Sequence, residues 1–187
     1  MKIVVVCTGN ICRSPAMEVL LAQALGDSVE VTSAGTAGMP TWPVSPPMAQ
    51  LLLSENPELA DAVNCFRSRP LTEKLVNEAD LILTATAAHR ADVLALNPLA
   101  LRRTMSLGEL ARLSTAVDPV PWADADTPAQ RLTKLVPLAQ AARHKFAPAA
   151  AQTDDIIDPY GRGDEAYSHS YRQINAHINT LLNSLRR

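Results

Sequence analysis

The sequence predicts an α/β fold of three layers, in which helices cover both faces of a central parallel four-stranded sheet. The first observation is the β-branched run Lys2–Val6 near the start of the chain, which is typical of a buried parallel strand. The second is that strand-like and helix-like segments alternate along the chain, as in repeated βαβ units. The third is the length of 187 residues, which suits one domain with a substantial core.

The first strand leads through a short loop, residues 8–13, into a helix. We expect Ser14 to be its N-cap and Pro15 to occupy its first position. Gly26 is expected to end this helix, because glycine adopts the left-handed conformation that follows many helices.

The other strands and helices follow in alternation. Further strands are predicted at Val29–Thr32, Asp80–Thr84 and Leu101–Met105, with a turn over Ser33–Thr36 after the first of these. Helices are predicted at Ser45–Leu53, after Thr72, at Ala87–Leu96, after Ser106, at Thr127–Arg143 and at Asp164–Leu185. Apolar residues recur at helical spacing in the last of these, which indicates one buried face.

Residues 117–152 differ in composition from the rest, being rich in Ala and Pro around one predicted helix. We interpret this segment as an insertion within a single domain, residues 1–187, and expect it to pack beside the acidic loop that follows it. No internal repeat and no clear second domain are visible.

Composition excludes several classes of function. A formal net charge of -2 without long basic runs argues against nucleic acid as partner. No apolar run approaches the ~20 residues of a membrane span, so we expect no membrane insertion and a cytoplasmic protein. Cys7, Cys12 and Cys65 are too few for a disulfide framework and lack the spacing of a zinc site, so no metal is expected. Cys65 is expected in the core.

Cys7 stands at the end of the first strand, directly before a helix N-terminus. The carboxyl ends of parallel strands collect ligands, and the N–H groups of a helix N-terminus favour an anion. Gly9 and Asn10 both tolerate left-handed backbone angles, which helps successive N–H groups face one concavity. Arg13 adds a planar fork that matches two phosphate oxygens. The alternative is a structural Cys7 with Arg13 on the surface.

The same surroundings favour a thiolate at Cys7, which makes it a competent nucleophile. The Ser14 hydroxyl lies close enough in sequence to reach its sulfur. Displacing an oxygen from phosphorus requires a proton donor, for which Asp154, Asp155 and Asp158 are candidates. Pro159 stiffens the loop beside Asp158. An Asx-type turn at the surface is the alternative reading of this loop.

The segment Val6–Pro15, with the sequence VCTGNICRSP, closely resembles the signature of the low-molecular-weight protein tyrosine phosphatases. Ser33–Thr36 resembles the second conserved turn of that family, and Arg67–Thr72 resembles the stretch before its third helix. Asp158–Tyr160 looks like its general-acid loop. The resemblance covers nearly the whole chain except residues 117–152.

The resemblance implies that Cys7 forms a cysteinyl-phosphate intermediate, that Arg13 binds the phosphate and that Asp158 is general acid and then base. The implied phosphate-binding loop is Thr8, Gly9, Asn10, Ile11, Cys12 and Arg13. Asn10 would hold the loop through a bond to Ser33, and Ser14 would stabilise the thiolate. The substrate rim would comprise Met39, which stands where bacterial members of the family often have Trp, together with Trp42 and Tyr160. Cys12 matches a second loop cysteine of many family members, which would form a reversible, protective disulfide with Cys7. The alternative is that Cys12 is a small buried packing residue.

The implied substrates are phosphotyrosine proteins or small aryl phosphates, hydrolysed without a cofactor, with a tyrosine kinase as counterpart. Two alternatives stay open. A thiol-dependent arsenate reductase uses the same fold and loop, although residues 79–99 contain no resolving cysteine. A phosphate-binding module without turnover would need the loop but not the acid.

Overall fold

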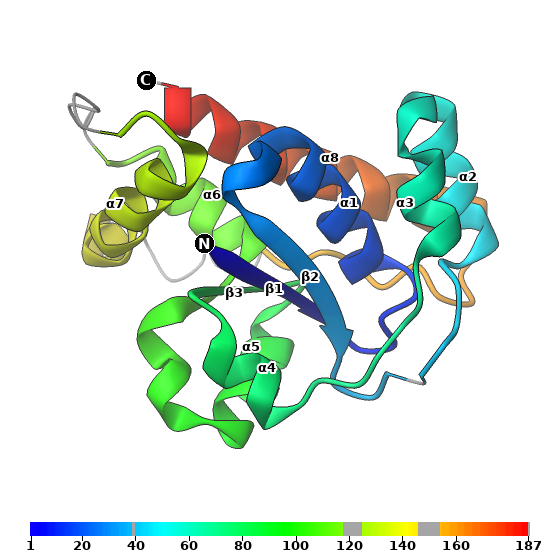
Figure 1. The fold of residues 1–187 in the computed structure, drawn as a ribbon, viewed down its shortest axis with the longest axis horizontal. Helices are drawn as coiled ribbons and strands as arrows, with labels where there is room; N and C mark the ends of the chain where they lie inside the picture. Colours follow the sequence, from blue (N-terminus) through cyan, green and yellow to red (C-terminus); the bar gives the residue numbers. More distant parts are fainter. Residues whose placement is uncertain (39, 118–124, 146–153, 187) are drawn as a thin grey trace.

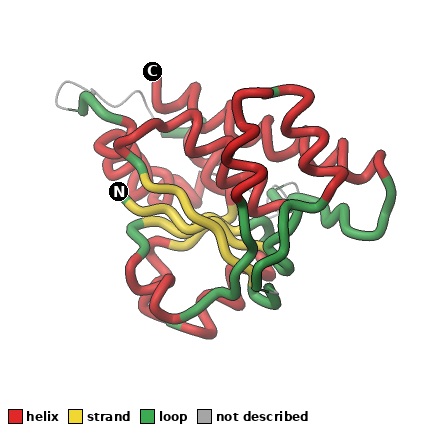
Figure 2. The backbone as a smooth tube through the Cα atoms, turned by 45° about the vertical axis from the view of Figure 1, so that its right-hand side comes forward, coloured by secondary structure: helices red, strands yellow, loops and turns green. Residues whose placement is uncertain are grey.

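The computed structural model describes residues 1–38, 40–117, 125–145 and 154–186. Its centre is a parallel sheet in the order β2-β1-β3-β4 (Figure 1). The strands are β1 (Lys2–Cys7), β2 (Glu30–Gly35), β3 (Leu81–Thr84) and β4 (Thr104–Ser106). Helices lie on both faces, as Figure 2 shows, so the predicted fold class is confirmed.

The central strand β1 is buried on both sides, because its side chains alternate between two apolar layers. Ile3 and Val5 belong to the larger layer, whereas Val4 and Val6 belong to a smaller one on the opposite face. This double burial explains why the strand reads as a continuous β-branched run.

Four helices supply much of the larger layer, one after β1, one after β2 and two after β4. They are α1 (Arg13–Leu25), α2 (Pro46–Glu55), α6 (Leu107–Ser114) and α8 (Asp164–Arg186). The apolar stripe predicted in α8 is buried, and α8 packs against α1 and α6. Helices α4 (Glu73–Glu78) and α5 (Ala87–Leu96) cover the other face. No helix in the described ranges is long and apolar enough to cross a membrane.

Several predicted boundaries were wrong at the sheet edges. Strand β2 continues to Gly35 instead of turning at Ser33, because its last residues pair with the end of β1. Residues Leu101–Arg103 belong to a 3-10 turn, and β4 begins only at Thr104, where pairing with β3 starts. These shifts follow from strand pairing, which local propensity does not report.

The start of α1 also differs from the prediction. The helix begins at Arg13, so Ser14 lies within its first turn and is not the N-cap. Helix α3 (Ala60–Cys65) was not predicted. It leaves Cys65 exposed, which corrects its assignment to the core, and the next residue, Phe66, is buried instead.

The described part of residues 117–152 contains α7 (Pro128–Ala141), which begins at a Thr127 capping box. Helix α7 contacts α6 and α8, and the Ala129 N–H donates to Ser28 Oγ. Ser28 precedes β2, so α7 lies at the amino end of the sheet. That end is opposite Cys7, so α7 does not pack beside the acidic loop. Residues 118–124 and 146–152 lie outside the described residues.

Gly108 is the point where α6 and residue Asp154 come into backbone contact. A Cβ atom at Gly108 would lie 2.7 Å from the Asp154 Cα and would overlap its carbonyl group. Helix α6 therefore approaches the start of the 154–160 segment more closely than any residue type other than glycine at position 108 would allow.

Gly108→Ala is predicted to destabilise the protein, although alanine normally favours a helix interior over glycine. Overpacking against a backbone should lower the free energy of unfolding by about 1–3 kcal/mol. Chemical denaturation measures this, with the exposed α2 substitution Gln50→Ala as control. A Gly108→Ala variant as stable as the parent would contradict the close approach.

Candidate active site

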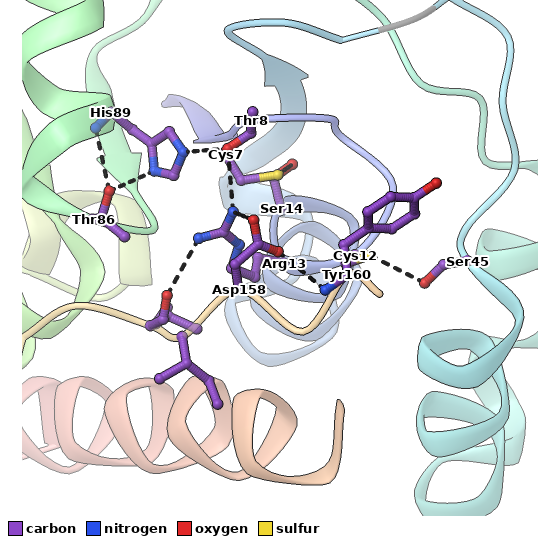
Figure 3. Close-up of polar contacts among 12 residues, drawn as sticks. Cys7, Thr8, Cys12, Arg13, Ser14, Ser45, Thr86, His89, Asp158 and Tyr160 are labelled. Carbon is purple, nitrogen blue, oxygen red and sulfur yellow. Dashed lines mark hydrogen bonds and ion pairs between the residues drawn. The ribbon is translucent and has the colours of Figure 1, made fainter. Parts of the chain in front are cut away.

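Cys7 ends β1 at the place where the strand order changes direction. The chain moves from β1 to β2 on one side and then crosses back to β3 on the other side of β1. Such a switch point leaves a crevice outside the carboxyl ends of the strands. Figure 3 shows the Cys7 side chain there, beside Arg13 and Asp158.

The loop from Thr8 to Cys12 turns its carbonyl groups outward. The N–H groups of Thr36 and Ala37 donate to the carbonyls of Cys7 and Thr8, both at 2.9 Å, and the Ser45 N–H donates to Ile11 at 2.7 Å. Because the N–H and C=O of a peptide point in opposite directions, this arrangement turns loop N–H groups toward the inner side. Such a concavity of N–H groups suits an anion.

Asn10 holds the loop from within. It is fully buried and has a left-handed φ of 54°. Its amide Nδ2 donates to Ser33 Oγ at 2.7 Å and to Ser14 Oγ at 2.9 Å, and its Oδ1 accepts from the Arg69 N–H at 2.8 Å. The Asn10–Ser33 contact expected from the family is therefore present.

Gly35 explains why the second strand ends in small residues. A Cβ atom at Gly35 would lie 3.0 Å from the Asn10 backbone nitrogen and would overlap the Thr8 carbonyl. The end of β2 thus packs directly against the loop.

The Cys7 sulfur lies 3.0 Å from Ser14 Oγ. Because Asn10 donates to that oxygen, the Ser14 hydroxyl proton remains available to the sulfur. A helix whose first turn carries this hydroxyl can stabilise negative charge on the sulfur through both the hydroxyl and its N-terminal N–H groups. Cys7 is only 2% exposed, yet it lines a cavity.

Arg13 is buried and reaches three parts of the chain. Its Nη2 contacts Asp158 Oδ2 at 2.8 Å and Thr8 Oγ1 at 3.2 Å, and its Nη1 donates to the Ile156 carbonyl at 3.3 Å. The Arg13 Nε is buried without a partner among the described residues. This N–H is a donor suited to a phosphate oxygen, so Arg13 does not have the surface position of the alternative reading.

Two of the three candidate acids have other partners. Asp154 forms a two-pronged ion pair with Arg112, with contacts of 2.7 and 2.9 Å, and is 5% exposed. This pair raises the pKa of the Arg112 guanidinium. Asp155 Oδ1 accepts from the Ala87 N–H at 2.8 Å, at the start of α5. Both carboxylates therefore anchor the loop.

Asp158 is the carboxylate that faces Cys7 and Arg13 (Figure 3). Its Oδ1 accepts from the Tyr160 N–H at 3.2 Å, which is an Asx-type turn, while Oδ2 pairs with Arg13. Its side chain is 42% exposed. Asp158 thus forms the surface turn of the alternative interpretation and also occupies the position expected of a proton donor.

The cavity above the loop has a volume of about 390 Å³. It is lined by Cys7, Thr8, Gly9, Ile11, Cys12, Arg13, Trp42, Asp158 and Tyr160. Trp42 and Tyr160 are 48% and 61% exposed, which places two large rings at its mouth. Met39, also assigned to the rim, lies outside the described residues.

Cys12 is buried beside the cavity, and all three cysteines are free thiols. Its Sγ contacts Ser45 Oγ at 3.2 Å and the Tyr167 hydroxyl at 3.5 Å. Burial raises the pKa of Cys12, and burial together with Cys12 raises the pKa of Tyr167 to about 12. The disulfide with Cys7 stays a prediction.

His89 is a residue that the sequence analysis did not single out. It is 5% exposed, and its Nε2 lies 2.9 Å from Thr8 Oγ1. No motif marks this contact, since the two residues are far apart in sequence. In the described part of the chain, no group of three or more His, Cys, Asp or Glu residues is arranged to hold a metal.

Asn10→Ala and Asn10→Gly are predicted to destabilise the protein to different extents. Both remove the three hydrogen bonds of the buried Asn10 side chain, which should lower the free energy of unfolding by about 2–4 kcal/mol. The alanine variant should lose up to about 1 kcal/mol more, because alanine disfavours the left-handed conformation. Urea denaturation measures both, with the exposed Asn183→Ala as control. Losses below about 0.5 kcal/mol in both variants would contradict this role.

Comparison with known proteins identifies the family. The sequence model of the low molecular weight phosphotyrosine protein phosphatases matches residues 2–117. A Ralstonia solanacearum protein named probable low molecular weight protein-tyrosine-phosphatase EpsP is 37% identical over 108 residues, which are 58% of this chain and 71% of that protein. A Bacillus subtilis protein-arginine-phosphatase is 39% identical over 93 residues, which are 48% and 59% of the two chains.

The fold agrees with this match beyond residue 117. The structure of Vibrio vulnificus Wzb in complex with benzylphosphonate has a TM-score of 0.65 and 26% identity, covering 97% of each chain. Sequence, fold and loop geometry lead to one conclusion: this chain belongs to the low molecular weight phosphotyrosine protein phosphatase family and is a hydrolase.

Proposed function

We propose that this chain hydrolyses phosphotyrosine in proteins through a cysteinyl-phosphate intermediate on Cys7. The observation that carries the proposal is that one cavity brings together the Cys7 sulfur, the Arg13 guanidinium and the Asp158 carboxyl group. A nucleophile, an anion-binding cation and a proton donor are the groups that a phosphoryl transfer requires.

In the first step, the Cys7 sulfur attacks phosphorus and the bond from phosphorus to the phenolic oxygen breaks. Asp158 gives its proton to that oxygen, so the phenol leaves neutral. The N–H groups of the loop and Arg13 bind the non-bridging oxygens, where charge accumulates in the transition state. We infer that these oxygens take the place of Asp158 Oδ2 at Arg13 Nη2. Asp158, no longer paired with the guanidinium, takes up a proton from solvent and turns toward the leaving group.

In the second step, Asp158 accepts a proton from water, and the water oxygen attacks phosphorus. The S–P bond breaks, inorganic phosphate leaves, and the Cys7 thiolate is restored. Ser14 stabilises the departing sulfur through the hydroxyl that lies 3.0 Å from it. Asp158 donates a proton in the first step and accepts one in the second, so one carboxyl group serves as acid and then as base.

The cavity lining supports an aromatic substrate. Trp42 and Tyr160 stand at the mouth, and Ile11 adds an apolar wall, so a flat ring can lie between them. The guanidinium of phosphoarginine, the substrate class in the name of the Bacillus relative, needs an acidic partner. In the described lining the only carboxyl group is Asp158, which the reaction already requires as the proton donor.

Neither alternative is favoured. A resolving thiol for arsenate reduction is absent after β3, and Cys65 lies against a different cavity, lined also by Glu18 and Arg67. A binding module without turnover has no use for the carboxyl group of Asp158, which the structure directs at the loop.

The family and the site support three further parts of the proposal. Residues 1–187 form one phosphatase domain with an insertion at 117–152, since residues from both ends of the chain share the site. A protein that dephosphorylates tyrosine implies a tyrosine kinase as counterpart. Because Cys7 must be a free thiol, a reducing compartment such as the cytoplasm suits the reaction.

Asp158→Asn is predicted to lower kcat by ~10²-fold or more, because the leaving oxygen loses its proton donor. The loss should be larger with phenyl phosphate than with p-nitrophenyl phosphate, whose phenolate leaves more readily. Asp155→Asn is the matched control, since an amide oxygen still accepts from Ala87, and it should retain kcat. A near-parental rate in Asp158→Asn would remove Asp158 from the acid role.

The substrate class can be tested with peptides that carry one phosphorylated residue. We expect kcat/KM for a phosphotyrosine peptide to exceed that for phosphoserine and phosphoarginine peptides by at least about 10²-fold. Trp42→Ala should raise KM for the phosphotyrosine peptide by about tenfold through lost ring contact. The exposed Leu99→Ala, remote from the cavity, serves as control. Preferential hydrolysis of phosphoarginine would overturn the assignment, and arsenate reduction with added thiol would restore the alternative enzyme.

A further inference from the structure

Helix α5 begins beside the active site. Its first turn contacts both loops that form the site, namely the phosphate loop (residues 8–13) and the acid loop (residues 154–160). Thr86 caps this helix, and His89 is the third residue of its first turn. The Ala87 N–H binds Asp155 of the acid loop at 2.8 Å. His89 contacts Thr8 of the phosphate loop at 2.9 Å. One helical turn therefore spans the two loops that must act together.

The His89 imidazole is held at both nitrogens. Its Nδ1 lies 2.8 Å from Thr86 Oγ1, and its Nε2 lies 2.9 Å from Thr8 Oγ1 (Figure 3). The Thr8 oxygen also accepts from Arg13 Nη2 at 3.2 Å. In either tautomer of the imidazole, Arg13 donates to a hydroxyl oxygen whose position His89 determines.

We propose that His89 is a positioning residue for phosphoryl transfer, which fixes the Thr8 hydroxyl and through it the Arg13 guanidinium. This inference rests on the proposed function of the site. His89 is not a catalytic residue, because two hydroxyl groups occupy its nitrogens and its ring does not line the cavity. It sets the direction of the guanidinium that must meet the phosphate oxygens.

The charge state of the imidazole suits this role. Burial is the main cause that lowers the pKa of His89, and the Arg13 charge lowers it further, whereas Asp92, Asp158 and Asp155 act in the opposite direction. The imidazole is therefore neutral at pH 7. A proton on the imidazole would place a second cation beside Arg13. This charge would compete with the phosphate for the alignment of the guanidinium.

A merely structural His89 would act through the stability of α5 alone, and a matched variant separates the two roles. Val93 lies on the same helix and is fully buried in the smaller apolar layer, whose buried members include no residue of either loop. Val93→Ala therefore destabilises α5 without touching Thr8 or Arg13. The exposed His169→Ala controls for loss of an imidazole elsewhere.

We expect His89→Ala to lower kcat with p-nitrophenyl phosphate by about 10- to 100-fold and to raise the inhibition constant of inorganic phosphate, because a misdirected Arg13 weakens both. His89→Gln, which keeps one polar contact to Thr8, should recover part of the rate. Thr8→Val should cause a similar loss, and the double variant should lose little more than either single variant. Val93→Ala should lose stability without these changes.

The pH dependence provides a further readout. Above the ordinary His pKa of ~6.5 the ratio of parental to His89→Gln activity should be constant, and it should fall at lower pH as the imidazole becomes charged. Because the folded pKa lies below the ordinary value, the contribution of a neutral His89 to stability is present above ~pH 6.5. This contribution is lost as the pH falls through the folded pKa.

The proposal is overturned if His89→Ala keeps the parental kcat and the parental inhibition constant of phosphate. It is also overturned if Val93→Ala, at an equal loss of stability, weakens catalysis and phosphate inhibition as much as His89→Ala does. Fully additive losses in the double variant would also overturn it. If His89→Ala does not fold, the comparison of His89→Gln with Thr8→Val decides the question. Hydrolysis by the parent protein tests the proposed function itself, so failure of that function is distinguishable from failure of the role of His89.

Discussion

The buried guanidinium of Arg13 is the constraint on which the rest of the site depends. A charge at 4% exposure is costly unless several groups surround it. Those groups are the Thr8 hydroxyl, the Ile156 carbonyl and the Asp158 carboxylate. Two of them lie more than 140 residues further along the chain, so satisfying this one cation closes the acid loop over the phosphate loop.

The acid loop is held by the fold, and its function depends on that support. Asp154 pairs with Arg112 of α6, and Asp155 binds the start of α5. The Ile156 N–H donates to the Ala85 carbonyl after β3. With three neighbouring residues anchored to three elements, Asp158 is left as the carboxyl group that can exchange between Arg13 and a leaving oxygen.

The phosphate loop is organised by the same means, but from residues close to it in sequence as well. Asn10 binds Ser14 and Ser33, and β2 approaches so closely that only glycine fits at position 35. A preformed ring of N–H groups needs no rearrangement when charge develops on the phosphate, which is the usual source of large electrostatic stabilisation. His89 extends this order to the side of the loop that faces α5.

The local pattern of the sequence by itself determined β1, the anion-binding loop from Cys7 to Arg13 and the amphipathic face of α8. Those features follow from nearest neighbours in the chain, through side-chain periodicity, turn-forming residues and a helix N-terminus. The local pattern left three acidic residues open, of which the family resemblance favoured Asp158. The tertiary structure pairs Asp154 and Asp155 elsewhere and places Asp158 at Arg13, and it alone decided that His89 is buried against Thr8. Such choices depend on which distant segments the sheet order brings together, and periodicity carries no information about them.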